Sequence, residues 1–445
     1  MVASSKMRVA LIILLMLYPI VFIPPVAAEK TSGLTWSRTY ANTLAPVSLD
    51  STSDRGFIMT TCCYVARVMK ADSTGQPEWE RYYTPTGYLE SDSFQVQQTS
   101  DRGYLVTGYV CCHPGEGWLL KLDYDGNVQW SRLYVGGNFL QVKQTLDRGY
   151  IVAGSAAGPE YPSDGWVLKL DPDGNIVWQE MFRDQDIRLV DQTRDGGFIV
   201  AGTVCVCGPT VRNAAAWVFK LDPNGRIVWE KGYLVSDRSD AYSVQQTREG
   251  GYIVAGQSSI GGLILRLDPN GNLLWSKSYE GRGITTSSIQ ETSDRGFIVS
   301  GRKSPATLSD IGGPFLLRLN GNGDLAWANI YGPANDFYGR ANSFLFTVKE
   351  TRDRGLIVSG ETFGQAWVLK TSPEGIIQGC PVMVPLNATL ADARTSVTDT
   401  TYSGVTTNAV VNTTSVNITV VSPSVQTQCT AFLDKEKRHS PNALR

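Results

Sequence analysis

The cysteines are the residues of this chain whose chemistry and spacing stand out first. An even number of cysteines is typical of disulfides formed in an oxidising compartment. We expect Cys380 and Cys429 to staple a C-terminal tail to the body, and the adjacent pairs either to bridge neighbouring repeats or to close as vicinal rings. The eight are Cys62, Cys63, Cys111, Cys112, Cys205, Cys207, Cys380 and Cys429.

A thiolate metal site is the alternative interpretation of these cysteines, because His113 directly follows Cys112 and imidazole and thiolate are both zinc ligands. The only other histidine is His439, however, and the cysteine spacings match no zinc finger or ribbon. The pattern therefore favours structural disulfides, and no metal ligand is predicted.

Other groups that could do chemistry are few. With only two histidines, the chain is poorly equipped for nucleophilic or metal-hydrolytic catalysis that relies on imidazole. Carboxylate pairs could act instead, but most aspartates stand in turns, where they satisfy backbone amides. The segment 123–127, DYDGN, begins like a calcium loop but lacks the distal glutamate and is interpreted as a hairpin turn. No catalytic residue and no cofactor are predicted.

The elements that must position these residues are short strands in a repeated unit. In residues 165–182, GWVLKLDPDGNIVWQEMF, a Pro-Asp-Gly turn joins two runs with alternating apolar residues, which predicts a β-hairpin. Two anchors recur. The first is an acidic residue followed by Arg or Gly and then Gly, at Asp54, Asp101, Asp147, Asp195, Glu249, Asp294 and Asp353. The second is a Trp four residues past the turn glycine, at Trp79, Trp130, Trp178, Trp229, Trp275 and Trp327.

The acidic anchors recur at intervals of 45 to 59 residues, which fits four strands per repeat and hence the blades of a propeller. The last repeat has Gly379 where the Trp should stand, while Leu34–Tyr40 resembles a fourth strand with nothing before it. We expect Trp36 to complete the seventh blade, which removes the exposed sheet edges. The predicted fold is an all-β, seven-bladed β-propeller closed by an N-terminal strand.

The first strand of each repeat is expected to line the central channel. One position in it is polar and sums to zero charge, which gives no indication of a charged substrate: Asp50, Gln97, Lys143, Asp191, Gln245, Gln290 and Lys349. The preceding position is apolar and is expected in the core: Leu49, Val96, Val142, Val190, Val244, Ile289 and Val348. Tight turns should gather on one face and loops of uneven length on the other, including 203–216, 302–314 and 332–343, which makes the loop face the candidate functional surface.

The segments flanking the propeller (29–379) have different compositions. Residues 1–28 have the basic start, apolar run and small residues of a secretory signal; an uncleaved membrane anchor is less favoured because prolines interrupt the run. Residues 380–429 form a tail rich in Thr, Ser, Asn and Val, in which 416–421 could add a strand, and 430–445 are a polar extension. The tail carries the candidate glycosylation sites Asn387, Asn412 and Asn417. A secreted or cell-surface glycoprotein without a transmembrane span in its mature chain is expected.

The unit 121–130, KLDYDGNVQW, resembles the tryptophan-docking repeat of the quinoprotein-type β-propellers, and the resemblance covers most of residues 34–379. It implies that each Trp packs against the next blade. Quinoprotein dehydrogenases typically have eight blades, and none of their cofactor ligands can be matched here. The chain as a whole is most similar to secreted prokaryotic repeat propellers.

These observations predict a binding or cell-surface interaction module that recognises a protein or glycan through the loop face. The net charge of −2 does not indicate a nucleic-acid-binding protein, because such proteins typically carry a basic surface. Whether the chain is an enzyme is left open, with the balance against it. The alternatives are a propeller enzyme, either a dehydrogenase dependent on pyrroloquinoline quinone (PQQ) with calcium or a polysaccharide-cleaving enzyme, and a surface-layer or filament subunit that self-associates through the tail.

Overall fold

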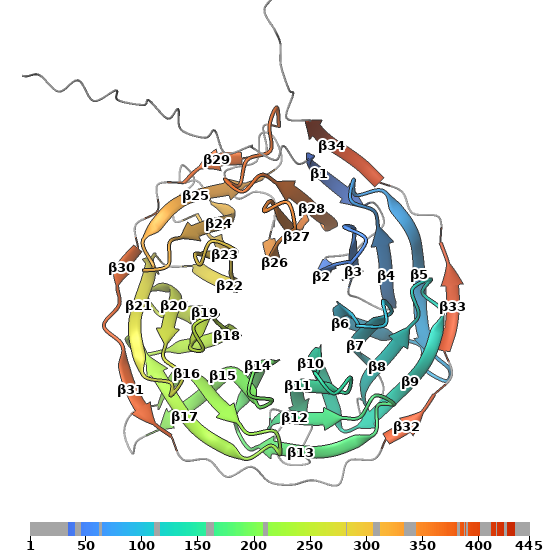
Figure 1. The fold of residues 1–445 in the computed structure, drawn as a ribbon, viewed down its shortest axis with the longest axis horizontal. Coiled ribbons are helices and arrows are strands. Elements are labelled where there is room, and N and C mark those ends of the chain that lie inside the picture. The colour runs from blue at the N-terminus through green and yellow to red at the C-terminus, as the bar shows by residue number, and fades with distance from the viewer. Residues whose placement is uncertain are drawn as a thin grey trace, which may run out of the picture.

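The protein is built of seven antiparallel sheets arranged as blades around a central channel (Figure 1). The computed structural model describes residues 34–40, 46–61, 65–110, 116–156, 164–207, 212–281, 283–305, 312–332, 344–380, 383–386, 388, 390–400, 411–414, 416–421 and 425–431. These residues contain strands and no helix. The predicted all-β, seven-bladed propeller is therefore confirmed.

Each blade has four strands, called a to d from the channel outwards. Blade 1 contains β2 (Pro46–Ser51), β3 (Phe57–Thr61), β4 (Ala66–Ala71) and β5 (Pro77–Pro85). Blade 2 contains β6 (Ser91–Gln98), β7 (Tyr104–Val110), β8 (Glu116–Leu122) and β9 (Val128–Val135). Blade 3 contains β10 (Gly137–Gln144), β11 (Tyr150–Ala156), β12 (Asp164–Leu170) and β13 (Ile176–Phe182). Blade 4 contains β14 (Asp186–Gln192), β15 (Phe198–Cys207), β16 (Arg212–Leu221) and β17 (Ile227–Leu234).

The remaining three blades follow the same plan. Blade 5 contains β18 (Ser239–Gln246), β19 (Tyr252–Ser258), β20 (Gly261–Leu267) and β21 (Leu273–Glu280). Blade 6 contains β22 (Ile284–Glu291), β23 (Phe297–Lys303), β24 (Gly313–Leu319) and β25 (Leu325–Tyr331). Blade 7 contains β26 (Phe344–Glu350), β27 (Leu356–Thr362), β28 (Gln365–Thr371) and, as strand d, β1 (Thr35–Tyr40).

The N-terminal strand closes the ring as predicted. β1 pairs with β28 in antiparallel register, with Trp36 opposite Lys370 and Thr39 opposite Trp367. The side chain of Trp36 is fully buried and lies 6.1 Å from the ring of Phe57 in blade 1. The first strand of the chain therefore joins the last blade to the first.

The acidic anchor of each repeat holds the a–b turn against strand c. In blade 2, Asp101 accepts hydrogen bonds from Gly103 N (3.0 Å) and from the hydroxyl of Thr99 (2.5 Å) and forms a 2.8 Å ion pair with Lys121. Burial alone would raise the pKa of Asp101, but these contacts hold that pKa below its ordinary value. Lys121 is almost fully buried, and a buried ammonium group without a partner would be strongly unfavourable, so the carboxylate also neutralises this charge. The aspartates thus have a structural role in the turns, as the sequence indicated.

The d-strand tryptophans pack against the following blade. Trp79 lies 5.8 Å from Tyr104, and Trp130 lies 5.9 Å from Tyr150, in both cases with the rings edge to face. Four residues after Trp79, the hydroxyl of Tyr83 donates to the carbonyl of Gly126 in the next blade's c–d turn (2.7 Å). The sequence analysis did not single out this Trp-x-x-x-Tyr spacing.

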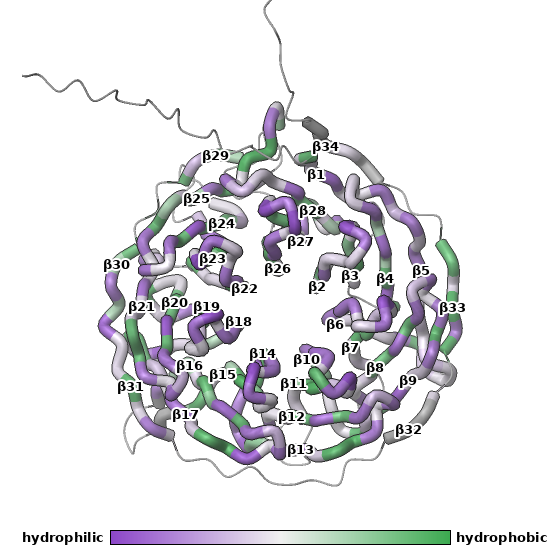
Figure 2. The backbone as a smooth tube through the Cα atoms, in the orientation of Figure 1, coloured by the Kyte–Doolittle hydropathy of each residue, from purple (hydrophilic) through white to green (hydrophobic). Residues whose placement is uncertain are grey.

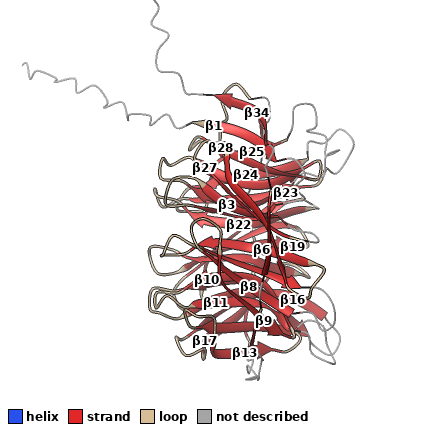
Figure 3. Cartoon of the chain, turned by 90° about the vertical axis from the view of Figure 1, so that its right-hand side faces the viewer, coloured by secondary structure: helices blue, strands red, loops and turns tan. Residues whose placement is uncertain are grey.

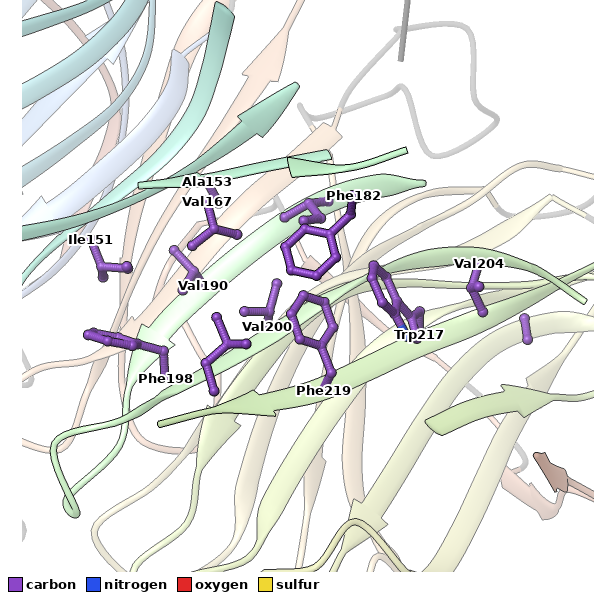
Figure 4. Close-up of a cluster of buried hydrophobic side chains, with 13 residues drawn as sticks. Ile151, Ala153, Val167, Phe182, Val190, Phe198, Val200, Val204, Trp217 and Phe219 are labelled. Carbon is purple, nitrogen blue, oxygen red and sulfur yellow. The ribbon is translucent and has the colours of Figure 1, made fainter. Parts of the chain in front are cut away.

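The core lies between neighbouring blades rather than within one blade. Figure 4 shows the cluster between blades 3 and 4, in which Val167 and Phe182 of blade 3 face Val200, Trp217 and Phe219 of blade 4. Such a layer of interdigitated apolar side chains is the usual way in which two sheets pack face to face. The strands cross the thickness of the disc, as its side view shows (Figure 3).

Six short strands of the tail lie on the outer edge of the ring (Figure 1). Each pairs antiparallel with a d strand of its own chain, on every blade except blade 3 among the described residues. The prediction of an added strand at 416–421 is confirmed by β33, and the other five were not predicted. They are β29 (Met383–Pro385), β30 (Leu390–Asp392), β31 (Ser396–Asp399), β32 (Val411–Thr413), β33 (Val416–Val420) and β34 (Val425–Ala431).

Candidate binding site

The a strands line the central channel, and the two rings lie where the sequence placed them. The seven polar residues from Asp50 to Lys349 all border a cavity of about 390 Å³. The apolar ring that begins at Leu49 is buried, with no member more than 4% exposed. The turns that rim the channel are strongly hydrophilic (Figure 2).

The polar ring holds neighbouring blades together. Gln97 accepts a 2.9 Å hydrogen bond from the backbone N–H of Gln144 in the next blade, and Gln245 does the same for Glu291. Asp50 accepts from Gln98 N (2.9 Å) and pairs with Lys349 across the seam between blades 7 and 1. Because Asp50, Gln97, Gln245, Gln290 and Lys349 are engaged in such blade-to-blade contacts, we assign these five a structural role.

Every a strand contains a β-bulge near the loop face, which the sequence analysis missed. The ladder with strand b skips Phe94 in blade 2, Leu140 in blade 3 and Arg188 in blade 4. A bulge re-aims one side chain out of the alternating pattern, and these three residues border the channel cavity. The mouth of the channel is therefore lined by side chains that simple period-two counting does not place there.

In blades 2 to 6 a glycine in strand b makes room for the bulge, whereas blade 1 has Thr61 at this position. A Cβ built on Gly202 would lie 1.9 Å from the carbonyl oxygen of Asp186, and one on Gly256 would lie 1.9 Å from that of Asp240. The glycine that ends motifs such as FIVAG at 198–202 is thus required by the close approach of strand a. This repeated glycine is the sequence signal from which the bulges could have been found.

The side of the mouth formed by blades 4 and 5 carries a polar cluster. The guanidinium of Arg188 lies 6.0 Å from the ring centroid of Tyr242, the bulged residue of blade 5, and pairs with Asp186 at 2.6 Å. Arg238 pairs with the nearly buried Asp240 at 2.9 Å. Burial, together with Asp240, raises the pKa of Tyr242, so its ring stays neutral at physiological pH. A cation stacked on an aromatic ring, bordering the same cavity as the apolar Phe94 and Leu140, is suited to bind an extended peptide or a glycan.

The long insertion at 203–216 is not wholly a loop, which corrects the sequence interpretation. The strands continue as a hairpin, with Val204 opposite Ala215 and Cys207 opposite Arg212, because apolar residues keep alternating past Gly202. At 302–314 the strands extend to Lys303 and resume at Gly313. Most of 332–343 lies outside the described residues.

The predicted cysteine and glycosylation sites are only partly within the described residues. Cys62, Cys63, Cys111, Cys112, His113 and Asn387 lie outside them. Cys205 and Cys207 are in β15 near the loop face. Asn412 is in β32, and Asn417 is exposed in β33. Across the described part of the chain, no three His, Cys, Asp or Glu side chains are grouped to hold a metal ion, and no helix is long and apolar enough to cross a membrane.

Comparisons with known proteins show the fold. No protein-family model and no curated protein sequence matches this chain. Among solved structures, the WD40 β-propeller domain of Doa1 is similar with a TM-score of 0.53 and 13% identity, over 76% of this chain and 97% of that one. Sqt1 of Chaetomium thermophilum, solved bound to the N-terminus of a ribosomal protein, is similar with a TM-score of 0.50 and 10% identity, over 75% and 98%. The chain is thus a seven-bladed β-propeller, and its likeness to the quinoprotein-type superfamily stays a resemblance of sequence motifs.

Proposed function

We propose that this protein is an exported binding module that captures a peptide segment of a partner protein at the loop-face mouth of its channel. The propeller fold often serves as a protein-interaction module. The observation that carries the proposal is the set of bulged residues at the mouth, where Phe94, Leu140 and Arg188 border one cavity and Arg188 stacks on Tyr242.

These residues offer the chemistry that an extended peptide needs. Phe94 and Leu140 supply apolar contact, and the exposed guanidinium of Arg188 can donate to a backbone carbonyl or a carboxylate. Rigid strands hold all of them, so little side-chain ordering is needed on binding. The peptide bound to Sqt1 belongs to that protein; for this chain a peptide ligand is part of the proposal, and a glycan is the second ligand class.

The enzyme alternatives gain no support from the channel. Its two carboxylates, Asp50 and Asp191, engage backbone amides, and Asp50 also pairs with Lys349. No observation in the described residues favours the dehydrogenase or the polysaccharide-cleaving enzyme. The tail strands pair with blades of their own chain, so polymer assembly by strand exchange would first require them to leave.

Export is part of the proposal and rests on residues 1–28 and on the cysteines. Ser37 connects the two ends of the proposed staple: it accepts a 2.9 Å hydrogen bond from the indole of Trp367, against whose cluster Cys380 packs, and its ladder partner in β34 is Cys429. Non-reducing peptide mapping of exported protein should find Cys380 joined to Cys429 and a chain starting near residue 29. Free thiols at both positions, or a retained leader, would contradict export and the staple.

The binding site is tested by selecting peptides from a displayed library on the intact protein. The variants Arg188→Ala and Phe94→Ala should lower the affinity of the selected peptides at least about tenfold, because an anchor at the centre of an interface typically contributes that much. Arg226→Ala is the matched control, since Arg226 is exposed in a c–d turn on the opposite face. Peptides that lose affinity only with the control variant, or with none of the three, would reject the proposed site.

A further inference from the structure

Six of the seven junctions between blades share one hydrogen bond on the tight-turn face. The last residue of strand a is Gln or Glu, and its side-chain oxygen accepts from the backbone N–H that follows the turn threonine of the preceding blade. Thus Gln98 accepts from Ser53 N and Gln144 from Ser100 N, both at 2.7 Å. The other four acceptors are Gln192, Gln246, Glu291 and Glu350.

The seventh junction, at the seam between blades 7 and 1, lacks this bond. The residue in the acceptor position is Ser51, whose side chain is too short to reach the N–H of Arg352 in blade 7. Among the described residues, no acceptor for that N–H is found. The seam instead contains a cavity of about 690 Å³, bordered by Ser51, Ser53, Arg55, Arg352 and Lys370.

The guanidinium group of Arg352 at this cavity also differs from its counterparts in other blades. Arg194 and Arg248 occupy the position of Arg352 in blades 4 and 5, and each donates to carbonyl oxygens of the next blade's turn. In the part of the chain that the structure describes, the guanidinium groups of Arg352 and Arg55 have no hydrogen-bond or ion-pair partner, and both side chains are exposed.

The acidic groups at the cavity are already engaged. Asp353 pairs with Lys370 at 2.9 Å, and Glu350 accepts from the N–H and the hydroxyl of Ser293 (2.7 and 2.9 Å). Two arginines and one backbone N–H are therefore left to interact with a ligand. Such a set of donors is complementary to a carboxylate, which a guanidinium can bind through two parallel hydrogen bonds.

We propose that the seam cavity binds a carboxylate-bearing ligand of the size of an acidic amino-acid residue, and that this carboxylate takes the place of the missing Gln or Glu side chain on Arg352 N–H. The ligand is either a free acid or an acidic residue of a peptide. The site lies on the face opposite the mouth that binds the partner in the proposed function, so the two proposals are independent.

The test is calorimetric titration of the intact protein with N-acetylglutamate and with a short acidic peptide. We expect saturable binding of at least one of them, and N-acetylglutamine should bind at least about tenfold more weakly, because hydrogen bonds to charged groups are the stronger ones. If only the peptide binds, the carboxylate comes from an acidic residue of a protein. If the free acid binds, with or without the peptide, the ligand is a small free acid. Absence of saturable binding by both probes, or equal binding of the amide, would overturn the proposal.

Two variants locate the site. Ser51→Gln supplies the missing acceptor within the chain and should abolish binding while raising the melting temperature, so a folding defect is not the cause. Arg352→Gln should weaken binding at least about tenfold, whereas Arg354→Gln, two residues away and outside the cavity lining, should leave it unchanged. Undiminished binding by Ser51→Gln would overturn the proposal, and the peptides selected at the opposite face serve as an independent check that this variant is intact.

Discussion

The hydroxyl of Tyr40 donates a 2.8 Å hydrogen bond to the carbonyl oxygen of Gly75. Tyr40 lies in the N-terminal strand, which belongs to blade 7, and Gly75 lies in the c–d turn of blade 1. Tyr83, Tyr134 and Tyr331 make the same contact with the next blade's turn. At the seam between blades 7 and 1, the N-terminal strand therefore supplies the tyrosine hydrogen bond that links neighbouring blades elsewhere in the ring.

Removing this hydroxyl should loosen the seam. Tyr40 is fully buried, so Tyr40→Phe leaves the Gly75 carbonyl without its donor and should lower the free energy of unfolding by about 1 kcal/mol. Chemical denaturation followed by tryptophan fluorescence measures the change. Tyr124→Phe, at an exposed position, should change it by less than about 0.5 kcal/mol; equal effects of the two variants would show that the seam contact contributes nothing specific.

The strand b glycines should not tolerate a methyl group. The Cβ of Gly256→Ala would lie 1.9 Å from the carbonyl oxygen of Asp240 and 3.0 Å from its carbon, so the bulge must shift, at a cost of about 1–3 kcal/mol. The melting temperature should fall clearly. Gly321→Ala is the control, because Gly321 is exposed in a turn and the nearest atom lies 3.2 Å away. A variant as stable as the control would show that the bulge is not fixed by this contact.

The turn aspartates should make the fold sensitive to acid. Burial alone would raise the pKa of Asp147, but its hydrogen bonds with Lys169, Thr145 and Gly149 hold that pKa below the ordinary value. Its contribution to stability is therefore present above the unfolded-state pKa of about 3.9 and is lost as the pH falls through the lower, folded-state pKa.

Asp147→Asn tests this dependence. At pH 7 the variant should be less stable by about 1 kcal/mol, a modest figure because the carboxylate is largely exposed and its charge is screened. The difference between wild type and variant should shrink below about pH 4 as the wild-type carboxylate is protonated. Denaturation curves at pH 7 and pH 3 measure it, and a difference that stays constant between them would contradict the proposed linkage.

The junction hydrogen bond should contribute to stability wherever it is present. Gln144→Ala removes the acceptor of Ser100 N, at 2.7 Å, and should lower the free energy of unfolding by about 0.5–1.5 kcal/mol. Ser51→Gln, which adds such an acceptor at the seam, should raise it. Denaturant midpoints of both variants give the comparison. Shifts in the same direction would show that the bond does not stabilise the blades.

The count of blades and the closure followed from local chemistry. Turns such as 171–175 are specified by residues that favour a tight turn, and in the structure Asp171 N donates to Asn175 O at 2.9 Å. The seventh repeat lacked a fourth strand, and Leu34–Tyr40, a strand with alternating apolar residues and no preceding partner, was the segment that could supply it. Each of these signals is contained in a few consecutive residues and recurs along the chain. The sequence alone was therefore sufficient to predict the propeller and the two rings of residues that line its channel.

The two proposed binding surfaces could be found only from the tertiary structure. A bulge that turns Arg188 towards the channel, and a seam where Ser51 lies too far from Arg352, depend on how the backbones of two strands or two blades approach each other. The same is true of the tail, whose strands pair with the outermost strands of six blades. Periodicity within one strand carries no information about those distances, because they are set by the packing of residues tens to hundreds of positions apart.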